Sequence, residues 1–132
     1  MINNLLKAIL FGFLAMGLYG ATSVSYTTIT GTAPCPAVGF IPACFIVFTG
    51  YLLMLAATIS LNLRHQLHWL FLVSWTPVFL LAFVGSIFEI SNGATCPKSS
   101  TGLALCYVSL SFAVVVATLY GFLVKFRWAK HN

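Results

Sequence analysis

The chain has 132 residues, of which 61% are hydrophobic and only 5% are charged, and its formal net charge is +5. Soluble domains carry about a quarter charged residues, so this composition excludes a water-soluble globular domain. The positive charge does not indicate nucleic acid as a partner, because the basic residues stand at the ends of apolar runs rather than in a patch. It is typical of a membrane protein whose flanks meet anionic head groups, so we expect the lipid bilayer to be a partner.

Four apolar runs are long enough to cross a bilayer, whose hydrocarbon core of about 30 Å needs roughly 20 helical residues. In chain order they lie near Leu5–Ser25, Pro42–Leu61, Trp69–Ile90 and Leu103–Val124. We predict that each run is a helix, because the backbone must satisfy its own hydrogen bonds in lipid and the runs lack the alternating polarity of barrel strands. Lys7 lies ahead of an apolar stretch, as in a signal peptide, but we expect this first run to be kept as a helix of the fold.

The basic residues predict how the bundle is oriented. With four spans, both termini and the link between the second and third runs share one side, which holds five of the six basic residues. The other side holds Lys98 alone. The positive-inside rule then places both termini in the cytoplasm and the two remaining loops, Tyr26–Ile41 and Ser91–Gly102, outside. We therefore expect an integral protein of a bacterial-type inner membrane, with its cysteine loops facing the periplasm.

The four cysteines all lie in or next to those outer loops, and their spacing indicates an internal repeat. Cys35-Pro36 is followed after seven residues by Cys44, and Cys96-Pro97 is followed after eight residues by Cys106. The second cysteine of each pair opens a helix. Each half therefore reads as a span, an outer loop with Cys-Pro, a second cysteine and another span.

The predicted fold class is thus an all-α integral membrane protein, a four-transmembrane-helix bundle that forms a single domain over residues 1–132. Two similar helical hairpins, about 1–63 and 64–132, make up this bundle. Each half has an even number of spans, so the halves share one orientation and the repeat is parallel, with a pseudo-two-fold axis along the membrane normal.

Paired cysteines in an oxidising compartment normally form disulfides. Within each half the natural bonds are Cys35–Cys44 and Cys96–Cys106, although four cysteines allow three connectivities. Closing a loop of about ten residues in this way stabilises a fold by roughly 2–3 kcal/mol. We interpret both bonds first as structural, because no neighbour except Lys98 offers a charge that would stabilise a thiolate. The chain is then a non-enzymatic subunit or partner-binding component of a membrane assembly, with other subunits or a second copy as partners and no cofactor.

Thiol–disulfide exchange is the alternative. In topology and in the outer placement of Cys35, Cys44, Cys96 and Cys106, the chain resembles DsbB, the quinone-dependent disulfide-forming protein, and the vitamin K epoxide reductases. This resemblance implies that the four cysteines are catalytic, that one pair passes electrons to the other, and that a quinone is the cofactor. The chain departs from both families because it has no Cys-x-x-Cys, and no arginine at its outer helix ends.

The remaining polar residues indicate little further chemistry. Glu89, the only acidic residue, lies near the outer end of the third run. We expect it to reach head-group water, or alternatively to act as a proton acceptor beside the second cysteine pair. His65 and His68 lie three apart, but no carboxylate or cysteine lies on their side, so we expect interfacial anchoring and no metal site. The sequence leaves open whether the bundle binds an apolar or lipid-like ligand.

Overall fold

The computed structural model describes residues 1–32, 35–60, 67–93 and 96–132. Within these residues the chain forms four helices: α1 (Ile2–Ile29), α2 (Ala43–Ser60), α3 (Leu67–Asn92) and α4 (Leu105–His131). All four are long and apolar enough to cross a membrane. The predicted all-α bundle of four transmembrane helices is therefore confirmed.

Three of the helices are longer than the spans predicted from hydrophobicity. α1 has 28 residues and α4 has 27. At 1.5 Å per residue each is about 40 Å long, more than the bilayer core of about 30 Å, so its ends extend beyond the hydrocarbon or it is tilted. α3 ends at Asn92, and the next residue, Gly93, has a left-handed backbone conformation with φ +75°. The Gly93 N–H donates to the Glu89 carbonyl at 2.8 Å. A glycine in this conformation is a common helix stop, because it has no Cβ to clash.

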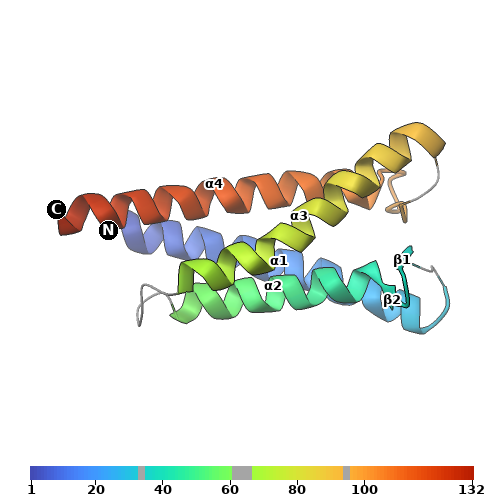
Figure 1. Cartoon of the computed structure of the whole chain (residues 1–132), viewed down its shortest axis with the longest axis horizontal. Coiled ribbons are helices and arrows are strands. Elements are labelled where there is room, and N and C mark those ends of the chain that lie inside the picture. The colour runs from blue at the N-terminus through green and yellow to red at the C-terminus, as the bar shows by residue number, and fades with distance from the viewer. Residues whose placement is uncertain (33–34, 61–66, 94–95) are drawn as a thin grey trace.

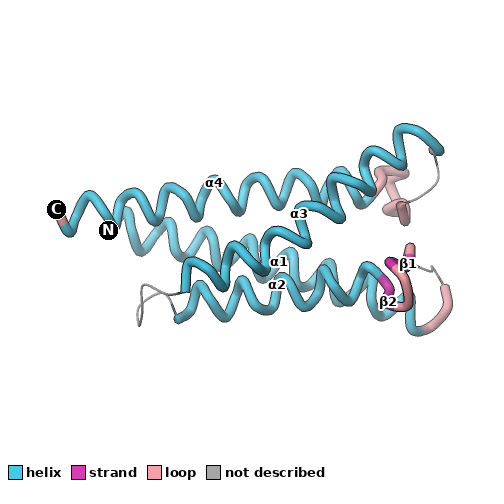
Figure 2. The backbone as a smooth tube through the Cα atoms, in the orientation of Figure 1, coloured by secondary structure: helices cyan, strands magenta, loops and turns pink. Residues whose placement is uncertain are grey.

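The four helices form a closed ring in which each packs against two neighbours. The packed pairs are α1 with α2, α2 with α3, α3 with α4, and α4 with α1. Figure 1 shows both termini at one end of the bundle, and the chain turns that carry the cysteines at the other. We call these the terminal end and the cysteine end. Toward the cysteine end, the α1–α2 pair and the α3–α4 pair move apart, as the backbone tube in Figure 2 also shows.

The apolar core fills the half of the bundle nearer the termini. All four helices contribute to it. Its buried members are Leu10 and Leu14 of α1, Tyr51, Met54 and Ala57 of α2, Phe71 and Val78 of α3, and Val116, Tyr120 and Leu123 of α4. In this half the rings of Phe71 and Tyr120 stack with centroids 3.7 Å apart. Trp75 donates its ring N–H to the Ala113 carbonyl at 2.9 Å, which ties α3 to α4.

Two glycines let neighbouring helices approach closely. A Cβ on Gly50 would collide with the Val78 side chain and would lie 3.1 Å from the Ser74 carbonyl, so α2 and α3 meet most closely here. A Cβ on Gly17 would lie 2.5 Å from the Tyr51 ring, which therefore uses the space that this glycine leaves on α1. Pro77 lies inside α3, where it removes one backbone donor from the helix.

Two very short strands, β1 (Ala37–Val38) and β2 (Ile41–Pro42), form an antiparallel pair in the loop before α2. The sequence analysis did not predict them, because two-residue strands leave no measurable alternation of polarity. Gly39 lies at the turn with φ +70°. Residues 37–42 thus form a hairpin that runs directly into α2.

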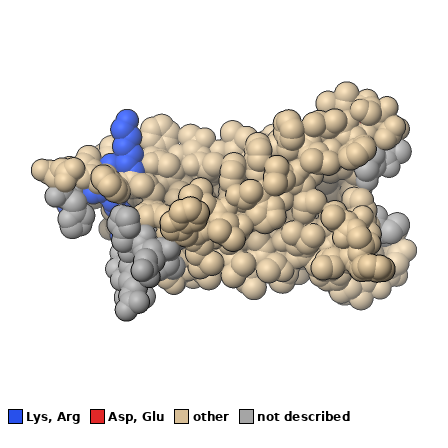
Figure 3. All heavy atoms as spheres, viewed as in Figure 1, with Lys and Arg blue, Asp and Glu red and all other residues tan. Residues whose placement is uncertain are grey.

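Basic side chains gather at the terminal end, which Figure 3 shows for one face of the molecule. Three of them, Lys125, Arg127 and Lys130, lie in the last two turns of α4. Lys7 lies in the second turn of α1. Arg64, which the sequence analysis counts with them, lies outside the described residues. These basic residues therefore lie at the end of the bundle where the sequence places them. The side of the membrane that this end faces stays a prediction.

Candidate functional site: two disulfides beside an apolar cavity

The first disulfide joins the loop after α1 to the beginning of α2. Cys35 and Cys44 are bonded, with their Cα atoms 6.2 Å apart, inside the usual range of 4.4–6.8 Å. Cys44 is the second residue of α2. The enclosed chain is also held by its backbone, because the Ala43 N–H donates to the Pro36 carbonyl at 3.0 Å. The bond therefore fixes the β1–β2 hairpin on the helix start.

The second disulfide does the same between α3 and α4. Cys96 and Cys106 are bonded, with their Cα atoms 6.0 Å apart, and Cys106 is the second residue of α4. The Leu105 N–H donates to the Pro97 carbonyl at 3.0 Å. This is the counterpart of the Ala43–Pro36 bond in the first loop, at the same place relative to the cysteines.

Both pairings are the ones that the matched halves favour, and the structure has no free cysteine among its described residues. The shared hydrogen bond adds to the likeness of the two loops. They also differ, since the first contains the β1–β2 pair, whereas the described residues of the second contain a single bridge, between Lys98 and Ala104. Whether the halves arose from one repeat stays a prediction.

Glu89 lies in a different environment from the one expected. Its side chain is only 8% exposed, so the expectation that it reaches head-group water is wrong. One carboxylate oxygen accepts the Cys96 N–H at 3.0 Å, and the Glu89 carbonyl accepts the Gly93 N–H. A buried carboxylate is stable only when hydrogen bonds replace its lost hydration. The only acid of the chain thus ties the second cysteine loop to the end of α3.

The two disulfides pack against small or polar groups of neighbouring helices. A Cβ on Gly85 would lie 2.9 Å from the Cys106 sulfur and 3.5 Å from the Cys96 sulfur, so this glycine of α3 leaves the space that the second disulfide occupies. The Cys96 sulfur lies 3.7 Å from the Gly85 carbonyl oxygen, a contact without a hydrogen bond, because a bonded sulfur has no proton to donate. The Thr28 hydroxyl of α1 lies 3.9 Å from the Cys44 sulfur.

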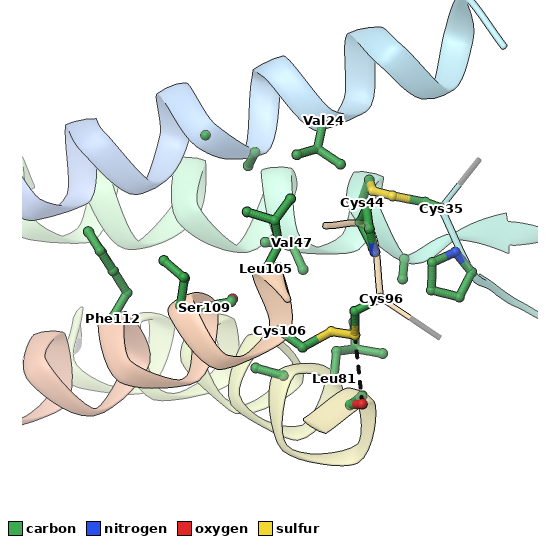
Figure 4. A pocket seen from close by; sticks show the side chains of 18 of the residues that line it. Val24, Cys35, Cys44, Val47, Leu81, Cys96, Leu105, Cys106, Ser109 and Phe112 are labelled. Carbon is green, nitrogen blue, oxygen red and sulfur yellow. Dashed lines mark hydrogen bonds between the residues drawn. A yellow bond between two sulfur atoms is a disulfide. The ribbon is translucent and has the colours of Figure 1, made fainter. Parts of the chain in front are cut away.

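Both disulfides line one cavity of about 870 Å³ between the two hairpins. Figure 4 shows the Cys35–Cys44 bond on one wall and the Cys96–Cys106 bond on the opposite wall, with apolar side chains between them. The walls come from all four helices, and their larger apolar side chains are those of Met16, Val24, Val47, Leu81, Phe88, Leu105 and Phe112. Ligand sites in proteins typically have volumes of about 300–1,000 Å³ and mostly apolar walls, so this cavity has the size and character of a binding site.

The floor of the cavity closes where the core begins. Tyr51 of α2 and Ser109 of α4 both line the floor, and the Tyr51 ring fills the space beside Gly17 of α1. Beside it, Phe112 of α4 meets Phe13 of α1 edge to face, with ring centroids 5.6 Å apart. These contacts join α1 to α2 and α1 to α4 below the cavity.

His68, the histidine whose side chain the structure describes, does not line this site. His68 lies toward the terminal end, where its Nδ1 is 2.6 Å from the Tyr120 hydroxyl. His65 lies outside the described residues, as does the side chain of His131. In the part of the chain that the structure describes, no three His, Cys, Asp or Glu residues lie together as a metal site would require.

The sequence analysis placed the four cysteines and Glu89 at this end, and the structure brings both pairs to one cavity. Two residues that shape the site, Gly85 and Tyr51, were not predicted to do so. One signal for Gly85 was present. It is the only glycine of α3 and lies four residues before Glu89, so both face the same neighbour.

The function of this site is inferred from the positions of the two disulfides and the cavity. No family model, curated protein or solved structure matches the chain. The architectural resemblance noted from the sequence therefore stays a prediction. The structure gives an integral membrane bundle of four helices, with two disulfides at one end that face a shared apolar cavity.

Proposed function

We propose that this chain is a small non-enzymatic component of a membrane assembly, and that its disulfides hold the loops at the cysteine end rigid for contact with a partner protein. One observation carries the proposal. At the tip of the hairpin closed by Cys35–Cys44, Phe40 is fully exposed, and Val38 and Ile41 beside it are each 55% exposed. We call Val38–Ile41 the apolar tip. Large apolar side chains on a rigid turn are typical of interaction sites.

The burial of the cysteines supports a structural role for the bonds. Cys44 is 9% exposed and Cys96 is 6% exposed. Thiol–disulfide exchange requires an attacking thiolate to reach a sulfur atom, so burial of one cysteine in each bond restricts access by a partner's thiol. Each bond also joins a loop to a helix start, where closure stabilises the fold.

The proposed setting is a bacterial-type inner membrane, with both termini in the cytoplasm and the apolar tip on the outer side. The asymmetry of basic residues between the two ends of the chain supports this orientation. The partner is then another membrane subunit, or a second copy of this chain, that presents an apolar surface at the outer face.

A photo-crosslinking amino acid placed at Phe40 tests the proposal in intact membranes. We expect adducts with a protein from this position, and the same adducts should disappear when the neighbouring Val38 and Ile41 are both replaced by Ser. Thr101, an exposed polar residue in the other loop of the cysteine end, is the matched control and should give no such adduct. Adducts with lipid alone from position 40 would contradict the proposal, since the tip would then be a membrane anchor.

A second candidate function is electron transfer from thiols to a quinone, and the shared cavity favours it. A dithiol partner would reduce one disulfide, giving two cysteine thiols and a new disulfide in the partner. The two thiols would then re-form their bond and pass two electrons and two protons to the quinone, which leaves as a quinol. An apolar cavity lined by both disulfides offers a lipid-soluble oxidant a route to the sulfurs that avoids water.

Titration of the purified protein against a thiol redox buffer separates the two candidates. We expect both bonds to resist reduction down to about −300 mV, as structural disulfides do. Reduction of either pair at milder potentials, above about −250 mV, together with dithiol-dependent reduction of an added quinone, would favour the second candidate over the first. Alkylation of freed cysteines followed by mass spectrometry reports which pair has opened.

A further inference from the structure

We propose that the cavity between the hairpins binds a lipid with one linear hydrocarbon chain along the bundle axis and an anionic head group at the cysteine end. This site does not depend on whether the disulfides exchange electrons, and it shares Val38, but neither Phe40 nor Ile41, with the apolar tip. Its occupant is the chain of a fatty acid or of an anionic phospholipid. Three features support this site: the length of the cavity, the nature of its two ends, and the exposed Lys98 next to Ser99 at its mouth.

The cavity runs along the helices and not across them. On α1 its wall includes Met16, Gly20 and Val24, which lie four residues apart on one face. On α3 the wall extends from Leu81 to Asn92. At 1.5 Å per residue these stretches are about 12 and 16 Å long. Half of a hydrocarbon core of about 30 Å is about 15 Å, so the cavity has the depth of one lipid leaflet.

The floor and the walls suit an alkyl chain. The floor is lined by Tyr51, Ser109 and Phe112, so two aromatic rings lie at the closed end. Apolar walls do not hold ordered water, because water there would lose its hydrogen bonds. Each methylene that enters such a cavity gains contacts with the wall. A chain inserted parallel to the neighbouring lipids therefore fits this space.

The mouth suits an anion. Ser99 and Asn92 line the cavity at the cysteine end, and Lys98, next to Ser99, is exposed. Two basic residues, Arg64 and Lys98, lie between the end of the second apolar run and the last turns of α4. Arg64 belongs to the inner link, so Lys98 is the basic residue of the cysteine end. Glu89, the only acidic residue of the chain, is buried, accepts the Cys96 N–H and is not among the residues that line the cavity. A carboxylate or phosphate at the mouth is therefore attracted by Lys98 without an opposing exposed acid.

Two glycines of α1 provide a matched pair of variants. A Cβ on Gly20 or on Gly12 would meet nothing within 4 Å, so a leucine fits the backbone equally at both positions. Gly20 lies in the middle of the α1 wall, whereas Gly12 lies on the same face two turns earlier and outside the cavity. Leucine at position 20 would project into the path of the chain. Leucine at position 12 would change only the outer surface of the helix.

Binding is measured on the oxidised full chain in phosphatidylcholine nanodiscs, with stearate that carries a spin label near the end of its chain. We expect an immobilised component with the wild type and with Gly12→Leu, displaced by unlabelled stearate. Gly20→Leu should bind about tenfold more weakly, the equivalent of about two buried methylenes. Val24→Phe, a second variant that narrows the same wall, should also weaken binding. Circular dichroism confirms that each variant is folded as the wild type is.

Replacing the charge tests the mouth. Lys98→Gln should weaken stearate binding about two- to fivefold, the usual range for one exposed ion pair, and should leave a spin-labelled methyl ester unaffected. Lys130→Gln, a basic residue of the terminal end, should change neither. Phosphatidylglycerol labelled on one chain distinguishes the sources: an immobilised component from it assigns a membrane phospholipid, and its absence beside bound stearate assigns a free fatty acid.

Three results would overturn the proposal. One is the absence of an immobilised component in the wild type. Another is equal binding by Gly20→Leu and Gly12→Leu, which would place the probe on the outer surface of the bundle. The third is displacement by a neutral quinone but not by stearate, which would make the cavity a site for a ring and not for an anionic chain.

Discussion

At the scale of single residues, two positions of α3 determine how the second cysteine loop is placed. Gly85 leaves the space that the Cys96–Cys106 bond occupies, and Glu89, one turn later, accepts the Cys96 N–H. Both act on the same loop from the same helix. A change at either position therefore acts through the placement of the second disulfide and not through the core, which lies in the other half of the bundle.

Gly85→Ala is the sharpest test of this placement. Its Cβ would lie 2.9 Å from the Cys106 sulfur, so the disulfide and its loop must shift, and overpacking of this kind costs about 1–3 kcal/mol. Gly121→Ala in α4 is the matched control, because its Cβ would meet nothing within 4 Å. There the gain in helix propensity should stabilise the fold by up to about 1 kcal/mol. The free energy of unfolding in mixed micelles measures both, and equal effects would argue against a tight contact at Gly85.

At the scale of elements, the helices follow from the sequence more fully than the loops do. A run of about 20 apolar residues must be helical in lipid, because its backbone has no other way to satisfy its hydrogen bonds. This constraint predicts α1 to α4, and the predicted ends differ from the observed ones by one to seven residues. It is silent on the β1–β2 pair, whose geometry comes from Gly39 and the Cys35–Cys44 closure and not from a hydrophobic period.

Glu89 and the cavity show why sequence reasoning stops at the site. An acid near a helix end commonly reaches water, and only the folded loop shows that a backbone N–H lies 3.0 Å from this carboxylate instead. The cavity depends on where α1–α2 and α3–α4 move apart. That separation depends on side-chain volumes at many contacts, among them Gly50 with Val78 and Tyr51 with Gly17, which have no signature in a single sequence.

The second disulfide is the element whose removal is most informative. Replacing Cys96 and Cys106 together by Ser should lower the free energy of unfolding by about 2–4 kcal/mol, because the open loop gains entropy in the unfolded chain. The same double replacement of Cys35 and Cys44 should have an effect of similar size, since the bonds close loops of similar length, with sequence separations of 10 and 9. Denaturant titration followed by tryptophan fluorescence measures both. A negligible loss in each variant would remove the main support for structural bonds.

At the scale of the whole molecule, the bundle is divided along its length. The half near the termini has a packed core and carries Lys7, Lys125, Arg127 and Lys130. The half near the cysteines contains a cavity and two disulfide-closed loops. A core stabilises the ring of helices at one end, so covalent closure is most useful at the other, where the helices separate. The disulfides then compensate for the packing that the cavity removes.

The orientation of this division in the membrane is the last prediction. Lys7, Lys125, Arg127 and Lys130 at the terminal end should remain in the cytoplasm, so the cysteine end should face outward. After reduction, a membrane-impermeant maleimide added to right-side-out vesicles should label the native cysteines. Asn132→Cys in a variant with all native cysteines replaced by Ser is the control, and it should react only in inverted vesicles. The reverse pattern would place the disulfides in a reducing compartment, where they would not persist, and would remove the basis of both proposed functions.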